Sequence, residues 1–575
     1  MMRKSSISLG LIIGAVIGLA VFLATVVTQM SSTGVAVERM LTREEAEEAA
    51  GRFVRNRLGY GEDAELRLFA VYVAEREASG YFLKNNIPIT GGERLGTRYP
   101  LDLFRVEIVD DKAEAVHYVD INPRTGEAAG WLLFANEAEN AEENAAPAKD
   151  GAAPVTEAAT ESSVGSAVWS ILTELGWTDA ELRLVSKEGG ETVVEARDPS
   201  FGEAVAVLRA GTAADGSVTA FTAQWTVPEA YTAETERQDG MAAPFANAGL
   251  AVVAAMQIAA LVFALSRLGD ARWGRGAVMA VAFALVYVVY NLNSFPGLKA
   301  AAAGWLEGGA LVAGTGLNRE DMLFSMTVAL IVSNVVTLLL AAGMYFSSVS
   351  GDLLIRKRYP FAWPNPSDPD FGRSVLRSAA KAYLFAPVVL GVQSLILIAI
   401  KLLFGMWDTL DALMSPHNTM NPLLVPLIAW SAALQEEVVF RLFAVPAFAA
   451  MFAAAAAKIV HRRSRADAQP GAGEPAGEGG PDAGGGGRAH APYPFAAVAA
   501  AALVSSFIWS LSHVQYPVYP FYSRIVEVTL LGFVFTYIFL RHGILTGIFT
   551  HAVVDFVWLG LSVIAVHPTP GYIAA

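Results

Sequence analysis

The stretch Leu427–Leu442, LIAWSAALQEEVVFRL, is an apolar segment that carries three charged side chains. Glu436, Glu437 and Arg441 lie about four turns into the predicted membrane span 421–445. Ionisable groups inside a span are costly and indicate a functional site. Glu437 and Arg441 are four residues apart, so they can pair on one helix face. Glu436 then points about 100° away and stays available for chemistry, although an interhelical ion pair is the structural alternative.

The composition around this segment indicates a membrane protein with an uneven charge distribution. The chain has 575 residues, of which 54% are hydrophobic and 17% charged, with a net charge of −14 and no cysteine. Residues 33–240 hold 19 basic and 38 acidic side chains, a net charge of −19, whereas the remainder carries +5. The lack of cysteine excludes disulfides, thiolate zinc sites and cysteine nucleophiles. There is no basic stripe interleaved with aromatic residues, so we expect no nucleic-acid partner.

Apolar runs predict about nine transmembrane helices, and therefore a multi-pass all-α membrane protein with an inserted soluble α+β extracytoplasmic domain. Arg3 and Lys4 precede the first run and favour a cytoplasmic N-terminus, with residues 1–31 as an uncleaved anchor and not a signal peptide. The other predicted spans are near 247–267, 277–293, 322–346, 379–405, 421–445, 495–514, 525–541 and 544–566. A tenth crossing at 445–460 is the alternative.

Loop charges set the expected orientation in the cell membrane, with residues 32–240 outside. The loops expected in the cytoplasm are basic, at 267–275, 356–358 and 461–465. The loops expected outside, at 408–421 and 515–522, have almost no Lys or Arg. The predicted divisions of the membrane part are helices over 246–346, a cytoplasmic loop over 347–376, and a catalytic domain over 377–566 that contains a disordered loop at 466–494.

The acidic region contains an internal repeat. Leu58–Leu68, LGYGEDAELRL, recurs as Leu175–Leu184, LGWTDAELRL, with one residue deleted. Each copy follows a helix-like stretch and precedes alternating β-like segments that end near a turn. The sequence therefore predicts two repeated α+β modules, at 32–136 and 164–240, joined by a flexible linker at 137–163. The segment Val119–Glu127, VDINPRTGE, is similar to the PepSY type of extracytoplasmic module. Such modules are associated with restraining proteases, so the outer region is expected to regulate the membrane part or recruit its substrate.

Two further motifs place histidines in the late spans. One is Trp509-Ser-Leu-Ser-His513, and the other is His551-Ala-Val-Val-Asp555, whose spacing stacks imidazole and carboxylate on one helix face. Each motif alone has a structural explanation, as an interfacial or hydrogen-bonded core histidine. Together with Glu436 they form the minimum set for holding a divalent metal or activating a water directly. HExxH is absent, so the chain is not an ordinary zincin.

The order Glu-Glu-x-x-x-Arg, aromatic-x-x-x-His and His-x-x-x-Asn/Asp resembles the CPBP family of intramembrane proteases. That family includes the CAAX prenyl protease 2 (Rce1-like) enzymes and bacterial Abi-type relatives linked to bacteriocin self-immunity. The resemblance covers Arg377–Val566. It implies that Glu436 is the general base, that His513 shares the water or a metal, and that His551 and Asp555 are ligands or oxyanion stabilisers.

The resemblance also implies supporting roles and a cofactor. Glu437 and Arg441 would be structural partners, and Trp509 stands where the family usually has Phe. Asp555 stands where many members have Asn, which adds a charge and favours a metal. Zinc is the expected ion, and its ligands would be Glu436, His513, His551 and Asp555.

The motifs therefore predict an intramembrane endopeptidase that hydrolyses a peptide bond in or next to the bilayer, with a glutamate-activated water and two histidines. Its expected partners are the lipid bilayer and a peptide or membrane-protein substrate. The alternative is a non-catalytic membrane sensor, scaffold or carrier with an extracytoplasmic ligand-binding domain, but a scaffold has no need for all three motifs in order. The enzyme also requires that the helix before His513 begin in the cytoplasm, because otherwise His513 lies too near the outer face to meet Glu436 and His551.

Overall fold

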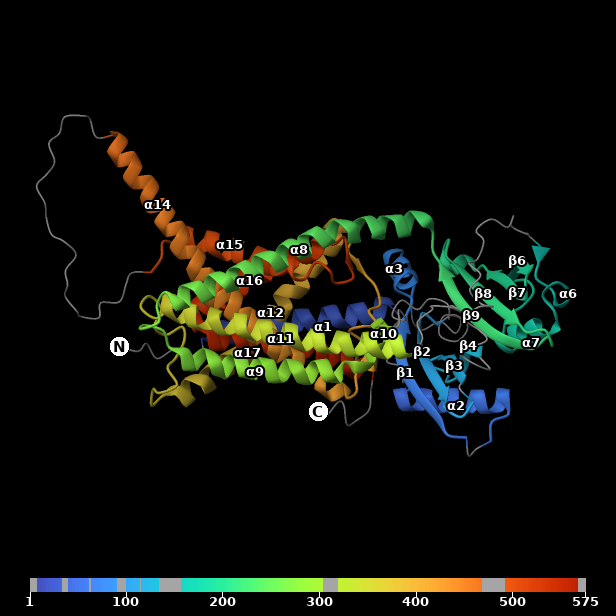
Figure 1. Ribbon diagram of the computed structural model, residues 1–575. Coiled ribbons are helices and arrows are strands. Elements are labelled where there is room, and N and C mark those ends of the chain that lie inside the picture. Colours follow the sequence, from blue (N-terminus) through green and yellow to red (C-terminus); the bar gives the residue numbers. More distant parts are fainter. Residues whose placement is uncertain are drawn as a thin grey trace, which may run out of the picture.

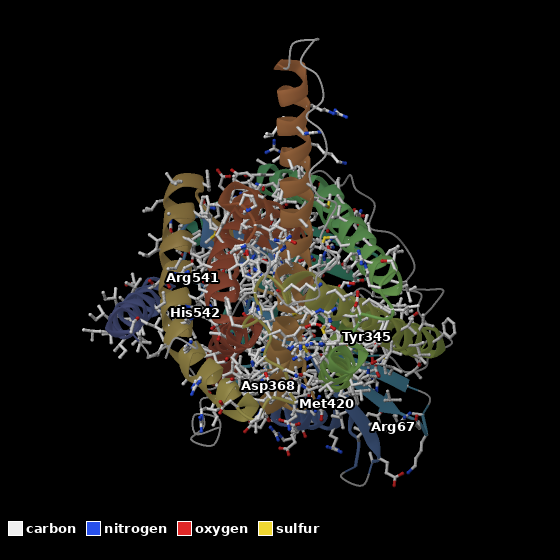
Figure 2. The ribbon with its side chains drawn as sticks, turned by 90° about the vertical axis from the view of Figure 1, so that its left-hand side faces the viewer. Arg67, Tyr345, Asp368, Met420, Arg541 and His542 are labelled. Carbon is white, nitrogen blue, oxygen red and sulfur yellow. The ribbon has the colours of Figure 1, made fainter. Side chains whose placement is uncertain are left out.

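The computed structural model is a helix bundle with a β-sheet domain at one end (Figure 1). It describes residues 8–33, 40–61, 64–89, 100–113, 115–133, 157–302, 319–467 and 492–566. Arg3 and Lys4, most of the predicted linker and most of the predicted disordered loop lie outside these residues. Figure 2 views the molecule from the end opposite the sheet domain, where the last part of α14 stands apart from the other helices.

Eight of the described helical segments are long and apolar enough to cross a membrane, and a ninth apolar helix is shorter. The helices of the bundle are α1 Leu9–Thr33, α8 Glu229–Leu265, α9 Trp273–Asn293, α11 Arg319–Ile355, α12 Phe371–Phe404, α13 Leu427–Glu436, α14 Val445–Asp467, α15 Phe495–Leu511, α16 Tyr522–His542 and α17 Ile544–Val566. One continuous helical segment, Pro422–Arg462, combines α13 and α14. The protein is therefore a multi-pass membrane protein.

Several helices differ in length from the predicted spans. α11 continues into the predicted loop, to Ile355, and α15 ends at Leu511, before His513. α8 begins at Glu229, so its first turns belong to the region predicted as the second soluble module. The first helix, α1, packs against α12 through two glycines: a Cβ on Gly391 would lie 2.5 Å from Gly18 Cα. The anchor is thus an integral part of the bundle.

The acidic region forms one nine-stranded antiparallel sheet of order β1-β2-β3-β4-β9-β8-β7-β6-β5. The strands are β1 Leu66–Ala74, β2 Asp102–Asp110, β3 Ala115–Ile121, β4 Ala128–Leu133, β5 Glu157–Ala158, β6 Leu182–Glu188, β7 Glu191–Ala196, β8 Val205–Thr212 and β9 Val218–Thr226. Smaller helices accompany them, namely α2 Arg43–Leu58, α3 Arg76–Lys84, α6 Glu161–Val164, α7 Ser166–Glu174 and α10 Phe295–Ala302.

Both halves of the sheet have a helix followed by a meander of four strands. α2 precedes β1 to β4, and α7 precedes β6 to β9, so each predicted helical stretch is helical. The two meanders join through β4 and β9, where Trp131 pairs with Phe221 and Leu132 with Ala220. The region is therefore one continuous sheet with a shared core. The end of the predicted linker is not flexible chain, because it forms β5 and α6.

The sheet domain sits directly on the bundle. α10 packs under the first strand, and Lys299 on α10 makes a buried ion pair with Glu107 on β2, at 3.0 Å. The two loops predicted to be outside, 408–421 and 515–522, contact this domain, for example through Asn418 and Tyr519. Arg356, from a loop predicted to be cytoplasmic, instead donates to the carbonyl of Asp270, in a second such loop. The two predicted classes of loop thus have different partners, and the side of the membrane each faces stays a prediction.

Candidate active site

The backbone around the two adjacent glutamates is a π-helix. α13 ends at Glu436, the π-helical segment runs from Glu437 to Ala444, and α14 begins at Val445. Pro446 follows at once and has no N–H to donate to the carbonyl four residues earlier, which favours a widened turn before it. π turns occur mostly as single turns inside α-helices and are frequent at functional sites. All eight residues of this one are buried.

Glu436 is the carboxylate on which the three motifs converge. Its Oε2 accepts a hydrogen bond from the indole Nε1 of Trp509 at 2.5 Å. His513 Nε2 lies 3.9 Å from Oε1, and His551 Nε2 lies 3.8 Å from Oε2. These two separations are too long for direct hydrogen bonds, and they leave each imidazole nitrogen facing the carboxylate across a gap that one water can bridge.

Glu437 holds His551 from the other side. Its Oε1 lies 3.0 Å from His551 Nδ1 and 3.4 Å from Arg441 Nη1, so the predicted Glu437–Arg441 pair forms. Nδ1–H of His551 therefore donates to Glu437, which leaves Nε2 directed at Glu436 and at Asp555 Oδ2, 3.5 Å away. Glu437 is fully buried, whereas the side chain of Asp555 is 33% exposed. Glu437 is thus a partner of His551 as well as of Arg441.

His513 lies just beyond the end of α15. Its Nδ1 is 3.1 Å from the carbonyl oxygen of Trp509, so Nδ1–H donates to the backbone and Nε2 carries the lone pair that faces Glu436. Tyr516 stacks on the imidazole, with ring centroids 5.7 Å apart. α15 spans 17 residues, or about 26 Å, and His513 just after its end lies beside Glu436. The depth difference that the sequence suggests therefore does not keep the two side chains apart, and the start of α15 in the cytoplasm stays a prediction.

The guanidinium of Arg441 stacks on the indole of Trp509, next to Glu436. The guanidinium of Arg441 lies 3.9 Å from the centre of the Trp509 ring and 5.4 Å from that of Phe535. The indole both covers this cation and donates to Glu436, and a phenylalanine could do only the first. The departure from Phe at this position thus adds a hydrogen bond to the candidate base.

The comparison with known families concerns this part of the chain. Residues 486–557 match the family model described as Type II CAAX prenyl endopeptidase Rce1-like. The chain contains an Rce1-like domain. This match confirms the resemblance stated from the motifs and is consistent with a CPBP intramembrane protease. No curated protein and no solved structure matches the chain.

The Rce1-like match includes α15, the loop after it, α16 and α17 as far as Val557. It therefore contains His513, His551 and Asp555, while the two glutamates lie before it. The structure brings all seven residues singled out in the sequence into one cluster. Trp509 and Glu436 are 73 residues apart in the sequence, and His551 and Glu437 are 114 residues apart.

Sequence reasoning missed a polar network beside the Rce1-like motifs. Arg524 donates to Glu527 at 2.6 Å, Gln393 donates to the other oxygen of Glu527 at 2.9 Å, and Trp558 donates to Gln393. The guanidinium of Arg524 lies 5.0 Å from the ring centre of Tyr516, the residue stacked on His513. Two charges at the start of an apolar span are the signal that could have revealed this network.

The donor set of the Rce1-like site has the chemistry that zinc prefers, with two imidazoles and two carboxylates. Their present spacing does not form a metal site, because no three His, Asp or Glu side chains among the described residues lie close enough together to hold an ion. Glu436 Oε2 is also engaged by the Trp509 indole. Zinc therefore stays a prediction, and no step proposed below passes through a metal.

Proposed function

We propose that the chain is an intramembrane endopeptidase in which Glu436 activates the hydrolytic water. The observation that carries this proposal is the convergence of Glu436, His513 and His551 from three separate segments, at 3.8 to 3.9 Å, in an Rce1-like protein. The substrate is a peptide or membrane protein whose scissile bond lies in or next to the bilayer.

The roles follow from the directions of the hydrogen bonds. A water between Glu436 and His513 gives its proton to the Glu436 carboxylate while its oxygen attacks the scissile carbonyl carbon. The His513 lone pair orients that water, because Nδ1–H is already committed to a backbone carbonyl. Glu436 then passes the proton to the leaving amine, so that both new chain ends are complete.

In this scheme His551 stabilises the oxyanion. Glu437 accepts from Nδ1–H and supplies negative charge, which favours a proton on Nε2 as well. Asp555 lies on the same side and adds to that preference. A protonated Nε2 can donate to the carbonyl oxygen as negative charge develops on it in the transition state.

The test compares cells that carry the wild type with cells that carry Glu436→Gln, by mass spectrometry of membrane-bound and released proteins. Fragments with a new C-terminus should occur only with the wild type, because the amide cannot accept the proton. Asp370→Asn, which removes an exposed carboxylate at the start of α12, is the matched control and should behave as wild type. Identical fragments from E436Q and wild type would support the alternative of a sensor, scaffold or carrier.

Zinc is tested separately, by metal analysis of purified wild type and His551→Ala. Zinc in the wild type that is lost in the variant would support the predicted metal site. Equal zinc content in both would contradict a metal site and leave a metal-free endopeptidase.

A further inference from the structure

The loop between α15 and α16, residues 512–521, connects His513 to the sheet domain. Its second half contains the short strand β11, Val518–Tyr519, which pairs with β10, Trp407–Asp408. The backbone N–H of Phe521 donates to the buried side chain of Gln238 on α8, at 3.0 Å. The loop is therefore fixed at its far end by parts of the chain that precede the Rce1-like domain.

A three-membered cluster attaches this loop to the sheet domain. Arg76, the first residue of α3, donates to the hydroxyl of Tyr519 at 2.7 Å, and that hydroxyl donates to Asp239 on α8 at 2.8 Å. Arg76 and Asp239 also pair directly at 3.2 Å. Tyr519 is 3% exposed and stacks on Trp407, with ring centroids 5.5 Å apart. Each of the three side chains thus contacts both others, although they come from three separate segments.

The rest of α3 is seated on the loop that carries β10. Ser79 Oγ accepts from the backbone N–H of Leu410 at 3.0 Å. The approach at Gly80 is so close that a Cβ there would lie 2.6 Å from the methyl carbon of Thr409. The N–H of Thr409 in turn donates to the carbonyl of Pro517, four residues after His513, at 3.2 Å. α3 therefore holds the His513 loop both directly and through its neighbour.

The strand that precedes α3 holds the other half of the site in the same way. Asn418 pairs with the backbone of Tyr72 on β1: its Oδ1 accepts from the Tyr72 N–H and its Nδ2 donates to the Tyr72 carbonyl, both at 2.7 Å. Asn418 lies in the segment that leads into α13, and α13 ends at Glu436. The segments that deliver Glu436 and His513 thus both rest on β1 and α3 of the sheet domain.

We propose that Arg76 is a positioning residue that sets the distance between His513 and Glu436. The idea rests on the endopeptidase function proposed above and extends it, because it makes the sheet domain a part of the catalytic framework. Removing the guanidinium leaves the buried Tyr519 hydroxyl without its donor and frees the loop from α3. A displacement of about 1 Å in a catalytic group can lower the rate about 100-fold.

The first experiment measures the loop position without using activity. The chain has no cysteine, so Gln515→Cys in the loop and Leu423→Cys before α13, both exposed, can carry two nitroxide labels. The distance distribution is measured by pulsed electron paramagnetic resonance on the full chain in lipid nanodiscs. We expect Arg76→Gln to shift or broaden it and Arg76→Lys to restore part of it.

Arg67→Gln is the matched control, since Arg67, labelled in Figure 2, lies on the neighbouring strand β1. Its ion pair with Asp111 is exposed. This control should leave the distribution as in wild type. A distribution that R76Q does not change, or that R67Q changes equally, would overturn the proposal.

The second experiment measures cleavage of a peptide that spans the first site mapped by the E436Q comparison. We expect R76Q and Tyr519→Phe each to lower kcat about tenfold or more with little change in KM, and their double variant to lose no more than either one. Unchanged kcat in R76Q, with E436Q inactive, would refute the positioning role alone. Cleavage by E436Q would instead refute the proposed function, while the label distances would still decide whether Arg76 positions the loop.

Discussion

A buried ion pair of the sheet, Arg105–Asp120, and a buried ion pair of the bundle, Arg441–Glu437, are built differently. In the sheet, Arg105 Nε and Nη2 each donate to one oxygen of Asp120 at 2.8 Å, a bidentate arrangement. In the bundle, Arg441 Nη1 and Glu437 Oε1 are 3.4 Å apart. Both Nη atoms of Arg441, and Oε2 of Glu437, have no hydrogen-bond partner among the described residues.

The difference indicates a structural role for the Arg105–Asp120 pair and a part in the candidate active site for the Arg441–Glu437 pair. A bidentate pair engages both oxygens of the carboxylate and fixes the two side chains in one geometry, which is typical of a structural role. In the bundle, Oε1 of Glu437 contacts both the guanidinium of Arg441 and the imidazole of His551. The guanidinium also stacks on the ring of Trp509. Buried polar groups without partners are rare in native structures, and a catalytic role is one of the explanations for them.

The largest expected effect on stability comes from breaking the bidentate Arg105–Asp120 pair. Asp120→Ala leaves the buried, charged Arg105 without its bidentate carboxylate, and should lower the free energy of unfolding of the sheet domain by about 3–5 kcal/mol. Pulse proteolysis of the full chain in detergent measures the unfolded fraction. Asp111→Ala breaks an exposed pair and should cost about 1 kcal/mol or less. Equal losses of unfolding free energy in the two variants would contradict the expected difference between the buried and the exposed ion pair.

The Glu437–Arg441 pair should respond in cleavage rate as well as in stability. Glu437→Gln keeps an acceptor for His551, but it removes the negative charge beside His551 and leaves the buried Arg441 without its counter-charge. We expect a cleavage rate about 10- to 100-fold lower, together with a lower thermal midpoint. A variant that melts earlier but cleaves at the wild-type rate below its midpoint would show that Glu437 is purely structural.

An effect of similar size is expected from the indole that covers Arg441. Trp509→Phe keeps the ring over the guanidinium and deletes only the donor to Glu436. Loss of one hydrogen bond to a charged group, about 1.5–3 kcal/mol, predicts roughly a tenfold or greater loss of kcat. An unchanged kcat would mean that the indole acts through stacking alone.

A further expected effect concerns pH and the sheet domain. Burial raises the pKa of Glu75 to about 8; Arg105 opposes this rise, and the carboxylates of Glu77 and Asp120 add to it. The folded state therefore keeps a proton that the unfolded state loses, so this group's contribution to stability falls as pH rises from about 4.5 to about 8.

Glu75→Gln has no proton to lose and should flatten that dependence. The difference in thermal midpoint between E75Q and wild type should grow in favour of the variant from pH 5 to pH 8. Glu188→Gln, at an exposed position on β6, is the control and should show no such trend. Parallel melting curves for E75Q and wild type across this range would contradict the expectation.

Local patterns in the sequence predicted what depends on residues close together in the chain. The apolar runs, the Glu437–Arg441 pair and the stacking of His551 on Asp555 follow from helical spacing. The sequence predicts two acidic modules, and the structure joins their strands in one sheet through two residue pairs between β4 and β9, a contact that no local pattern reveals. The position of His513 beyond its helix and the contact of Glu437 with His551 depend on packing between distant segments, which a single sequence does not reveal.

The π-helical segment has a consequence for deletions as opposed to substitutions. A π turn is an α-helix that has accepted one extra residue and has widened to hold it, so the helix on either side largely keeps its phase. Deleting a single residue between Glu437 and Ala444 would let α13 and α14 run on as one regular helix, with the face of α14 that meets α15 still turned toward α15. The same deletion in the regular part of α14 would rotate everything after it by about 100° about the helix axis. The π-helical segment should therefore tolerate the loss of one residue better than the α-helices that flank it.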